Sequence, residues 1–144
     1  MTVSVILGEK GSNVFTILPS AGIEQAAKIL RDRKCGALVV ADKAGTMVGI
    51  VSERDIVRTI GDMGAKGLML CIQDIMTRSV HTCQSNDSVA VMMQLMTKYR
   101  IRHVPIIDNG KLTGLVSQTD LIKHQLAEQD NQVRAMKNLN IAKK

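Results

Sequence analysis

Apolar residues recur at helical spacing in two places along the chain. The first stripe lies at positions i, i+3, i+4 and i+7 and consists of Ile23, Ala26, Ala27 and Leu30. The second stripe has the same spacing, lies in the second half of the chain, and consists of Val89, Met92, Met93 and Met96. This spacing gathers apolar side chains on one face of a helix, so each stripe predicts an amphipathic helix.

Short apolar runs lie on both sides of each predicted helix. They span residues 14–17, 37–41 and 47–51 in the first half of the chain, and 80–83, 104–107 and 112–116 in the second. Runs of this length predict strands, and the Gly-containing turn between the last two runs of each half predicts a hairpin. A further helical run follows each hairpin. Both halves therefore have the predicted order β-α-β-β-α.

The two halves are copies of one another. The segment GIVSERDIVR at 49–58 recurs as GLVSQTDLIK at 114–123, with every apolar position kept. A repeat of about 60 residues is only marginally stable alone. We therefore expect an α/β (α+β) fold in which two β-α-β-β-α repeats pack together with pseudo-twofold symmetry. The predicted parts are a first repeat (1–60), a linker with a short lead-in helix (61–79), a second repeat (80–126) and a helical tail (127–144).

The charge of the chain favours an anionic partner. The net charge is +6 and the pI is near 9.5, which suits nucleic acid, an anionic membrane surface or a phosphorylated small molecule. Phe15 and Tyr99 are the only Phe, Trp or Tyr residues, whereas proteins that bind single-stranded nucleic acid stack the bases on such side chains. The composition therefore argues against single-strand binding.

The sequence also predicts the environment of the protein. It has no apolar run of the roughly 20 residues that span a bilayer and no recognisable export signal. Its three cysteines are irregularly spaced, which suits reduced thiols, so we expect a cytoplasmic protein without a membrane partner. Cys71, His81 and Cys83 are residue types that bind zinc, but neither a fourth ligand nor a Cys-x-x-Cys pair accompanies them, and we expect no metal site.

One polar motif, Ser-x-x-Asp, stands between a strand and a helix in each repeat, as Ser52 with Asp55 and as Ser117 with Asp120. A capping box explains it structurally, because the hydroxyl accepts from a helical N–H and the carboxylate favours the positive helix end. The same arrangement suits a ligand, because the carboxylate can accept sugar hydroxyls while the helix N-terminus faces a phosphate. Both interpretations stay open at this point.

With these motifs the chain resembles a tandem pair of CBS domains, named after cystathionine beta-synthase. The signature Gly-hydrophobic-Val-Ser-x-x-Asp, present twice in the order β-α-β-β-α, carries the resemblance, which spans about residues 3–126. The segments DIMT at 74–77 and RHVPIID at 102–108 are also similar to parts of such pairs. The resemblance implies a homodimer in the form of a flat disc. It also implies a cleft between the repeats for an adenosine-containing ligand, namely AMP, ADP, ATP, NAD(H) or S-adenosylmethionine.

The resemblance also assigns roles to individual residues. Asp55 and Asp120 would hold ribose hydroxyls, and Ser52 and Ser117 would lie beside the ribose or a phosphate. The residues that would meet phosphates are Arg54, Arg102 and His103. The residues that would frame adenine are Thr16, Ile17, Thr82 and Cys83, which would open the first helix of each repeat, together with Ala37, Leu38 and Val104.

The remaining charged residues have simpler explanations. Cations near the ends of the first helices favour the helix dipole and are expected in solvent; they are Arg31, Arg33, Lys34, Lys98 and Arg100. His103 is either a structural histidine at a strand edge or a phosphate contact. His81 and His124 are expected on the surface.

These observations lead to one main function and two alternatives. The main expectation is a non-catalytic regulatory module that senses an adenine nucleotide and passes its occupancy to a separate protein through dimer geometry, because the sequence contains no motif for a nucleophile, a base or a catalytic cofactor. The alternatives are a basic nucleic-acid-binding protein, with Lys and Arg in the tail as contacts, and a structural dimer whose clefts take no ligand.

Overall fold

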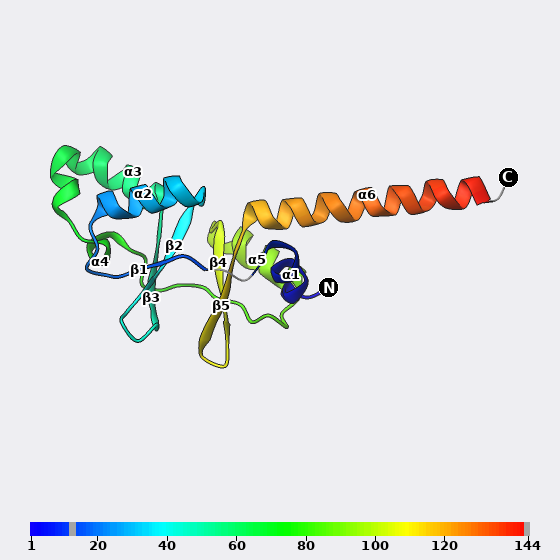
Figure 1. Ribbon diagram of the computed structural model, residues 1–144, viewed down its shortest axis with the longest axis horizontal. Coiled ribbons are helices and arrows are strands. Elements are labelled where there is room, and N and C mark those ends of the chain that lie inside the picture. The colour runs from blue at the N-terminus through cyan, green and yellow to red at the C-terminus, as the bar shows by residue number, and fades with distance from the viewer. Residues whose placement is uncertain (12–13, 143–144) are drawn as a thin grey trace.

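The computed structural model describes residues 1–11 and 14–142 and contains two repeats (Figure 1). The first has the predicted order β-α-β-β-α, and the second has the same order without its first strand. The elements of the first repeat are β1 (Thr16–Ile17), α2 (Ile23–Arg33), β2 (Ala37–Ala41), β3 (Met47–Ser52) and α3 (Glu53–Met63). Those of the second repeat are α5 (Val89–Tyr99), β4 (His103–Asp108), β5 (Lys111–Ser117) and α6 (Gln118–Ala142). Within the described residues, three helical segments lie outside these runs, namely α1 (Val3–Lys10), the 3₁₀ helix η1 (Gly64–Met69) and α4 (Ile72–Ile75). The mixed α/β class is confirmed.

The strand predicted at residues 80–83 is wrong, since only Cys83 forms a bridge there, parallel to Ile106. The N–H of Cys83 donates to the carbonyl of Pro105 at 3.1 Å, and its carbonyl accepts from the N–H of Ile107 at 2.9 Å. The N–H of Val80 instead donates to the carbonyl of Arg78 at 3.1 Å, so it is not part of a strand ladder. The apolar character of residues 80–83 therefore predicted a strand, although the backbone forms a β-bridge at Cys83 alone.

The two hairpins place equivalent residues beside each other. In the first repeat β2 pairs parallel with β1 and antiparallel with β3, and Ala37 is opposite Ser52. In the second repeat β4 pairs antiparallel with β5, and His103 is opposite Ser117. In each hairpin, the serine at the end of the second strand thus lies beside the first residue of the first strand.

Each repeat has its own hydrophobic core. The core of the first repeat contains Ile23, Ala26, Leu30, Leu38, Val40, Val51 and, from α4, Ile72. The core of the second contains Val89, Met92, Met96, Val104, Ile106, Val116 and, from α1, Val3 and Ile6. The two helical stripes are confirmed, except that Ala27 and Met93 are exposed.

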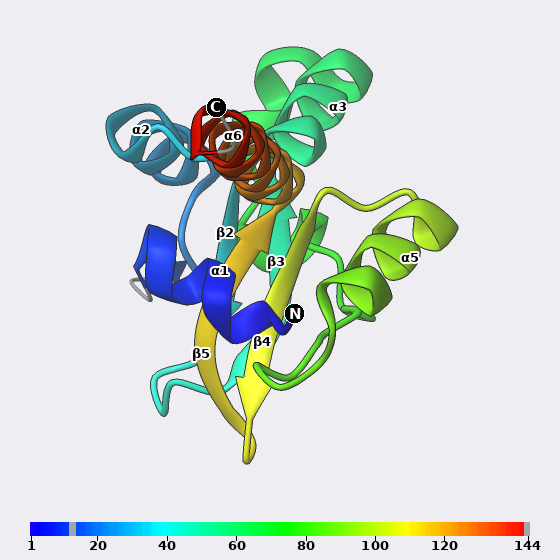
Figure 2. The ribbon, with the colours of Figure 1, turned by 90° about the vertical axis from the view of Figure 1, so that its right-hand side faces the viewer.

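Helix α6 runs through the expected boundary between second repeat and tail as one continuous helix. Leu121 and His124 face the body of the molecule and are buried, whereas residues 129–140 are exposed. Figure 1 shows the helix projecting far beyond the strands toward the C-terminus, and Figure 2 shows the same helix nearly end-on. Residues 143–144 of the predicted tail lie outside the described residues. None of the helices within residues 1–11 and 14–142 has the length and apolarity needed to cross a membrane.

Candidate functional site

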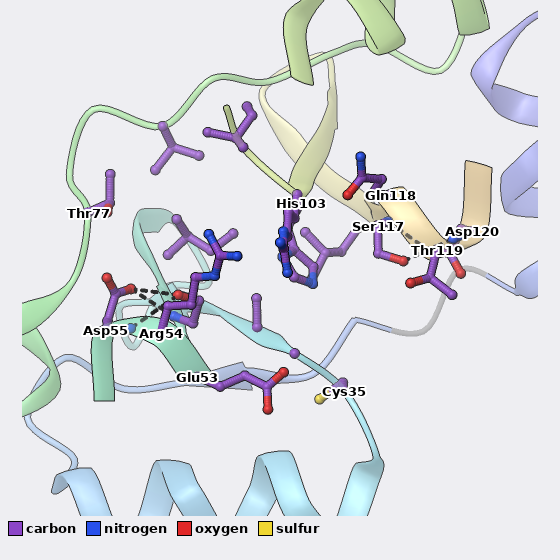
Figure 3. A pocket seen from close by; sticks show the side chains of 18 of the residues that line it. Cys35, Glu53, Arg54, Asp55, Thr77, His103, Ser117, Gln118, Thr119 and Asp120 are labelled. Atoms are coloured by element: carbon purple, nitrogen blue, oxygen red, sulfur yellow. Dashed lines mark hydrogen bonds between the residues drawn. The ribbon is translucent and has the colours of Figure 1, made fainter. Parts of the chain in front are cut away.

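A cleft with a volume of about 670 Å³ lies between the repeats. It lies beside the points where β3 passes into α3 and β5 passes into α6, so the starts of both helices line it. We call the side that holds Ser52, Asp55 and Arg58 the Asp55 half, and the side that holds Ser117 and Asp120 the Asp120 half. Figure 3 shows Arg54 and Asp55 on one side, Ser117 and Asp120 on the other, and His103 between them.

The capping interpretation of both Ser-x-x-Asp motifs is confirmed. The N–H of Ser52 donates to Asp55 Oδ2 at 2.9 Å, and the N–H of Asp55 donates to Ser52 Oγ at 3.4 Å. The corresponding distances in the other half are 2.8 Å for Ser117 N to Asp120 Oδ2 and 3.1 Å for Asp120 N to Ser117 Oγ. These bonds fix both carboxylates at the helix N-termini. They use Oδ2 of each carboxylate, so Oδ1 takes no part in the capping.

Positive charge dominates the wall of the cleft. Within the described residues, the lining contains three carboxylates, on Glu53, Asp55 and Asp120, and seven Lys and Arg side chains, on Lys10, Lys34, Arg54, Arg58, Arg100, Arg102 and Lys123. A concave surface with such an excess attracts anions and concentrates them near its mouth. The charge of the cleft wall therefore favours an anionic ligand.

Two of these cations sit at matched backbone positions. Lys34 ends α2 and Arg100 ends α5, and both adopt the left-handed conformation, with φ of 52° and 53°. Both residues are exposed, as expected. The left-handed turn at the end of each helix also carries them to the cleft wall, so their description as helix-end charges alone is incomplete.

His103 forms the centre of the cleft floor. Its ring packs on the first repeat so closely that a Cβ at Gly36 would lie 3.1 Å from His103 Nε2. Burial lowers the pKa of His103, Lys10 and Arg102 lower it further, and the charge of Asp120 opposes them. The imidazole is therefore neutral near pH 7, and it joins the repeats as an uncharged group.

Comparison with known proteins identifies this architecture. The sequence model of the family described as CBS domain matches residues 11–62 and 72–127. The chain belongs to the CBS-domain family. The two matches fall on the two repeats, so the molecule is a CBS pair.

Solved CBS proteins share the fold closely. A CBS-domain containing protein from Agrobacterium tumefaciens is 39% identical with a TM-score of 0.84, covering 86% of this chain and 92% of that one. A putative signal-transduction protein with CBS domains from Burkholderia ambifaria is 35% identical with a TM-score of 0.82, covering 90% and 96%. The CBS domain pair of protein MJ0100, solved with 5′-methylthioadenosine and S-adenosyl-L-methionine, is 28% identical with a TM-score of 0.79, covering 89% and 98%.

The structure brings together eight of the residues expected in the ligand site of the CBS pair. They are Ala37, Ser52, Arg54, Asp55, Arg102, His103, Ser117 and Asp120, and all line the cleft. The other six expected residues are Thr16, Ile17, Leu38, Thr82, Cys83 and Val104, none of which lines it. Four of the six are core residues at most 5% exposed. Nor do Thr16 or Thr82 open a helix, since α2 begins at Ile23 and α5 at Val89.

The sequence analysis missed several residues of the cleft. Lys10, Thr77, His81 and Lys123 line it. The repeat offset pairs Lys123 with Arg58, whereas no sequence signal points to Lys10. His81 is half-buried and stacks on Tyr99 with ring centroids 3.7 Å apart, so it lies at the surface only in part. The surface placement of His124 is wrong, because its ring is 4% exposed and Nδ1 lies 3.0 Å from Glu9 Oε2.

Proposed function

We propose that this CBS pair is a non-catalytic regulatory module that binds a phosphorylated adenosine nucleotide in the cleft between its repeats. The observation that carries the proposal is the combination of two helix-capping aspartates with seven Lys and Arg side chains around one cavity among the described residues. A carboxylate held at a helix N-terminus suits a ribose diol, and the surrounding cations suit phosphate oxygens.

The charge of the cleft favours phosphorylated nucleotides over other adenosine compounds. The solved relative binds methylthioadenosine, which is uncharged, and S-adenosylmethionine, which carries a positive sulfonium. Neither carries a phosphate, the group whose oxygens Arg54, Arg58 and Arg102 would contact in this chain. We therefore expect AMP, ADP, ATP or NAD(H) to bind more tightly than S-adenosylmethionine.

The regulatory part of the proposal requires a change of shape. A bound ligand shifts an equilibrium between two shapes only by its difference in affinity for them. We propose that a homodimer carries this change, with apolar side chains of α3 at its interface, since Val57 is 70% exposed and Met63 is 44% exposed. Light scattering should give a dimer, and small-angle scattering should change when AMP is added.

Thermal unfolding of nucleotide-free protein tests the binding function. The ligands are AMP, ADP, ATP, NAD, NADH, S-adenosylmethionine and adenosine, each at high concentration. A ligand at 100 times its dissociation constant adds about 2.7 kcal/mol to the free energy of unfolding, which raises the Tm by several degrees. A rise with the phosphorylated compounds supports the proposal. No rise with any of them, in folded and empty protein, contradicts it, and steeply salt-dependent DNA binding would then favour the nucleic-acid alternative.

Substitution of Arg54 separates phosphate binding from adenosine binding. Arg54→Ala should weaken AMP binding roughly tenfold, the loss expected for one charge-assisted contact, and leave adenosine binding unchanged. The control is Arg134→Ala, which removes the same charge from the projecting part of α6, where Arg134 pairs with Asp130 at 3.3 Å. Titration calorimetry measures both affinities. An equal loss for AMP and adenosine would show that Arg54 only shapes the site.

A further inference from the structure

Helix α1 takes the same place on the second repeat that α4 takes on the first. The N–H of Val3, which starts α1, donates to the carbonyl of Asp87 at 2.9 Å. The N–H of Ile72, which starts α4, donates to the carbonyl of Ala21 at the same distance. Asp87 stands just before α5 at the position that Ala21 holds just before α2. The two short helices are therefore equivalent by the pseudo-twofold symmetry.

The equivalence continues for one turn along the two helices. Leu7 packs against Gly114 of β5, where a Cβ would approach Leu7 Cδ2 to 2.5 Å. Met76, next after α4, packs against Gly49 of β3, where a Cβ would approach Met76 Sδ to 2.7 Å. Each lead-in segment thus rests on the glycine that begins the recurring Gly-hydrophobic-Val-Ser motif of a repeat.

Beyond this turn the two segments diverge. Helix α4 ends, and the N–H of Thr77 donates to the carbonyl of Ile50 at 2.9 Å. Helix α1 continues to Lys10, whose ammonium donates to the carbonyl of Leu115, the residue equivalent to Ile50. A backbone N–H in the Asp55 half is therefore replaced by a side-chain cation in the Asp120 half.

The same ammonium also binds the carboxylate of the Asp120 half. Lys10 Nζ lies 2.7 Å from Asp120 Oδ2, with the two side chains 31% and 17% exposed. Burial raises the pKa of the Asp120 carboxyl, but its bonds to Lys10 and Ser117 outweigh burial, so the pKa lies below its usual range. Among the residues the structure describes, Asp55 has no such ion pair, and its bonds go to Ser52.

We propose that Lys10 closes the Asp120 half to a ribose diol, so that each chain binds a single nucleotide, in the Asp55 half. Lys10 already neutralises the Asp120 carboxylate, and a diol that reached Oδ2 would have to replace its charge-assisted bond, which is among the stronger bonds a carboxylate makes. Among the described residues, no cation pairs with the Asp55 carboxylate. Lys10 lies outside both β-α-β-β-α runs and makes two similar halves unequal. This inference rests on the proposed nucleotide-binding function.

The test counts bound AMP. Equilibrium dialysis of the full chain should give one AMP per chain for the wild type and two for Lys10→Met. The affinity of the Asp120 half should rise roughly tenfold to a hundredfold when the competing bond is removed. Lys10→Arg keeps a cation at Asp120 and should remain at one. Lys43→Met makes the same change of net charge at an exposed turn position and should also remain at one.

Each outcome decides between the two proposals. Lys10→Met is expected to fold, because the fully buried Val3 and Ile6 anchor α1. Its far-UV circular dichroism should match that of the wild type before dialysis. Two AMP per wild-type chain, or one per chain in both wild type and Lys10→Met, would overturn the role of Lys10 while leaving nucleotide binding in place. No AMP bound by either protein would overturn both proposals.

Discussion

At the residue scale, the cleft holds two cations in a backbone conformation that favours glycine. Lys34 and Arg100 follow their helices at the position where glycine most often ends a helix, because a left-handed residue with a Cβ is strained. Both side chains line the cleft. A cation in a strained position, twice and at equivalent places, is typical of a site where binding outweighs stability.

Replacing Lys34 by glycine should therefore separate stability from binding. Lys34→Gly should raise the free energy of unfolding by about 0.5 to 1 kcal/mol, because the left-handed strain disappears, and it should weaken AMP binding. Lys34→Ala should weaken binding equally without the gain in stability, since alanine keeps the Cβ. Urea unfolding and titration calorimetry measure the two quantities. If neither variant binds AMP more weakly than the wild type, Lys34 does not contact the ligand.

His103 should make the stability of the protein depend on pH. Its folded pKa lies below the ordinary value near 6.5 because of burial. As the pH falls below about 6.5, the imidazole of the unfolded chain binds a proton before that of the folded chain does. The free energy of unfolding therefore decreases as the pH falls from about 6.5 to the folded pKa. Urea unfolding between pH 7.5 and 5 should show this loss, and His103→Gln should reduce its slope. An unchanged slope would assign the titration to another group.

At the element scale, hydrophobic pattern predicted the helices and hairpins that each repeat builds from its own residues. The stripes at 23–30 and 89–96 correspond to α2 and α5, and the runs around the turns correspond to β2 with β3 and β4 with β5. Local spacing suffices there because each of these elements buries one face against its neighbours in the same repeat.

The hydrophobic pattern failed for segments whose structure depends on residues distant in the sequence. Residues 3–10 have no helical stripe, yet they form α1 because Val3 and Ile6 are buried in the core of the second repeat, far along the chain. The run at 80–83 has the composition of a strand, but only Cys83 finds a partner. Tertiary contacts decided both cases, and such contacts override local propensity.

The same division holds for the candidate site. Asp55, Asp120 and their serines were predictable because a motif next to a helix start has a fixed local geometry. Lys10 was not, since Lys10 and Asp120 lie near opposite ends of the sequence and meet only in the folded chain. The adenine-framing positions, such as Ile17 and Val104, follow from the family resemblance, and their backbone contacts to a ligand stay a prediction.

At the scale of the whole molecule, the chain crosses between the two repeats, which have separate cores. Ile72 of α4 follows the first repeat and is fully buried in its core. Ile6 of α1 precedes the first repeat, yet it is 1% exposed in the core of the second. The chain therefore begins in the core of the second repeat and then crosses to the first repeat, which it builds before it returns. Each core includes a helix from outside its own β-α-β-β-α run.

This connection predicts that the pair unfolds as one unit. Ile6→Ala and Ile72→Ala should each lower the free energy of unfolding by about 2 to 5 kcal/mol, the cost of removing a buried isoleucine. Because α1 belongs to the second core, Ile6→Ala should reduce hydrogen-exchange protection at the amide of Met92, although Met92 lies far away in the sequence. Ile72→Ala should reduce protection at the amide of Leu38.

In both variants a single thermal transition should move to lower temperature, because loss of one core also removes the wall of the shared cleft. Two separate transitions, with protection lost only near the substituted residue, would mean that the repeats fold independently.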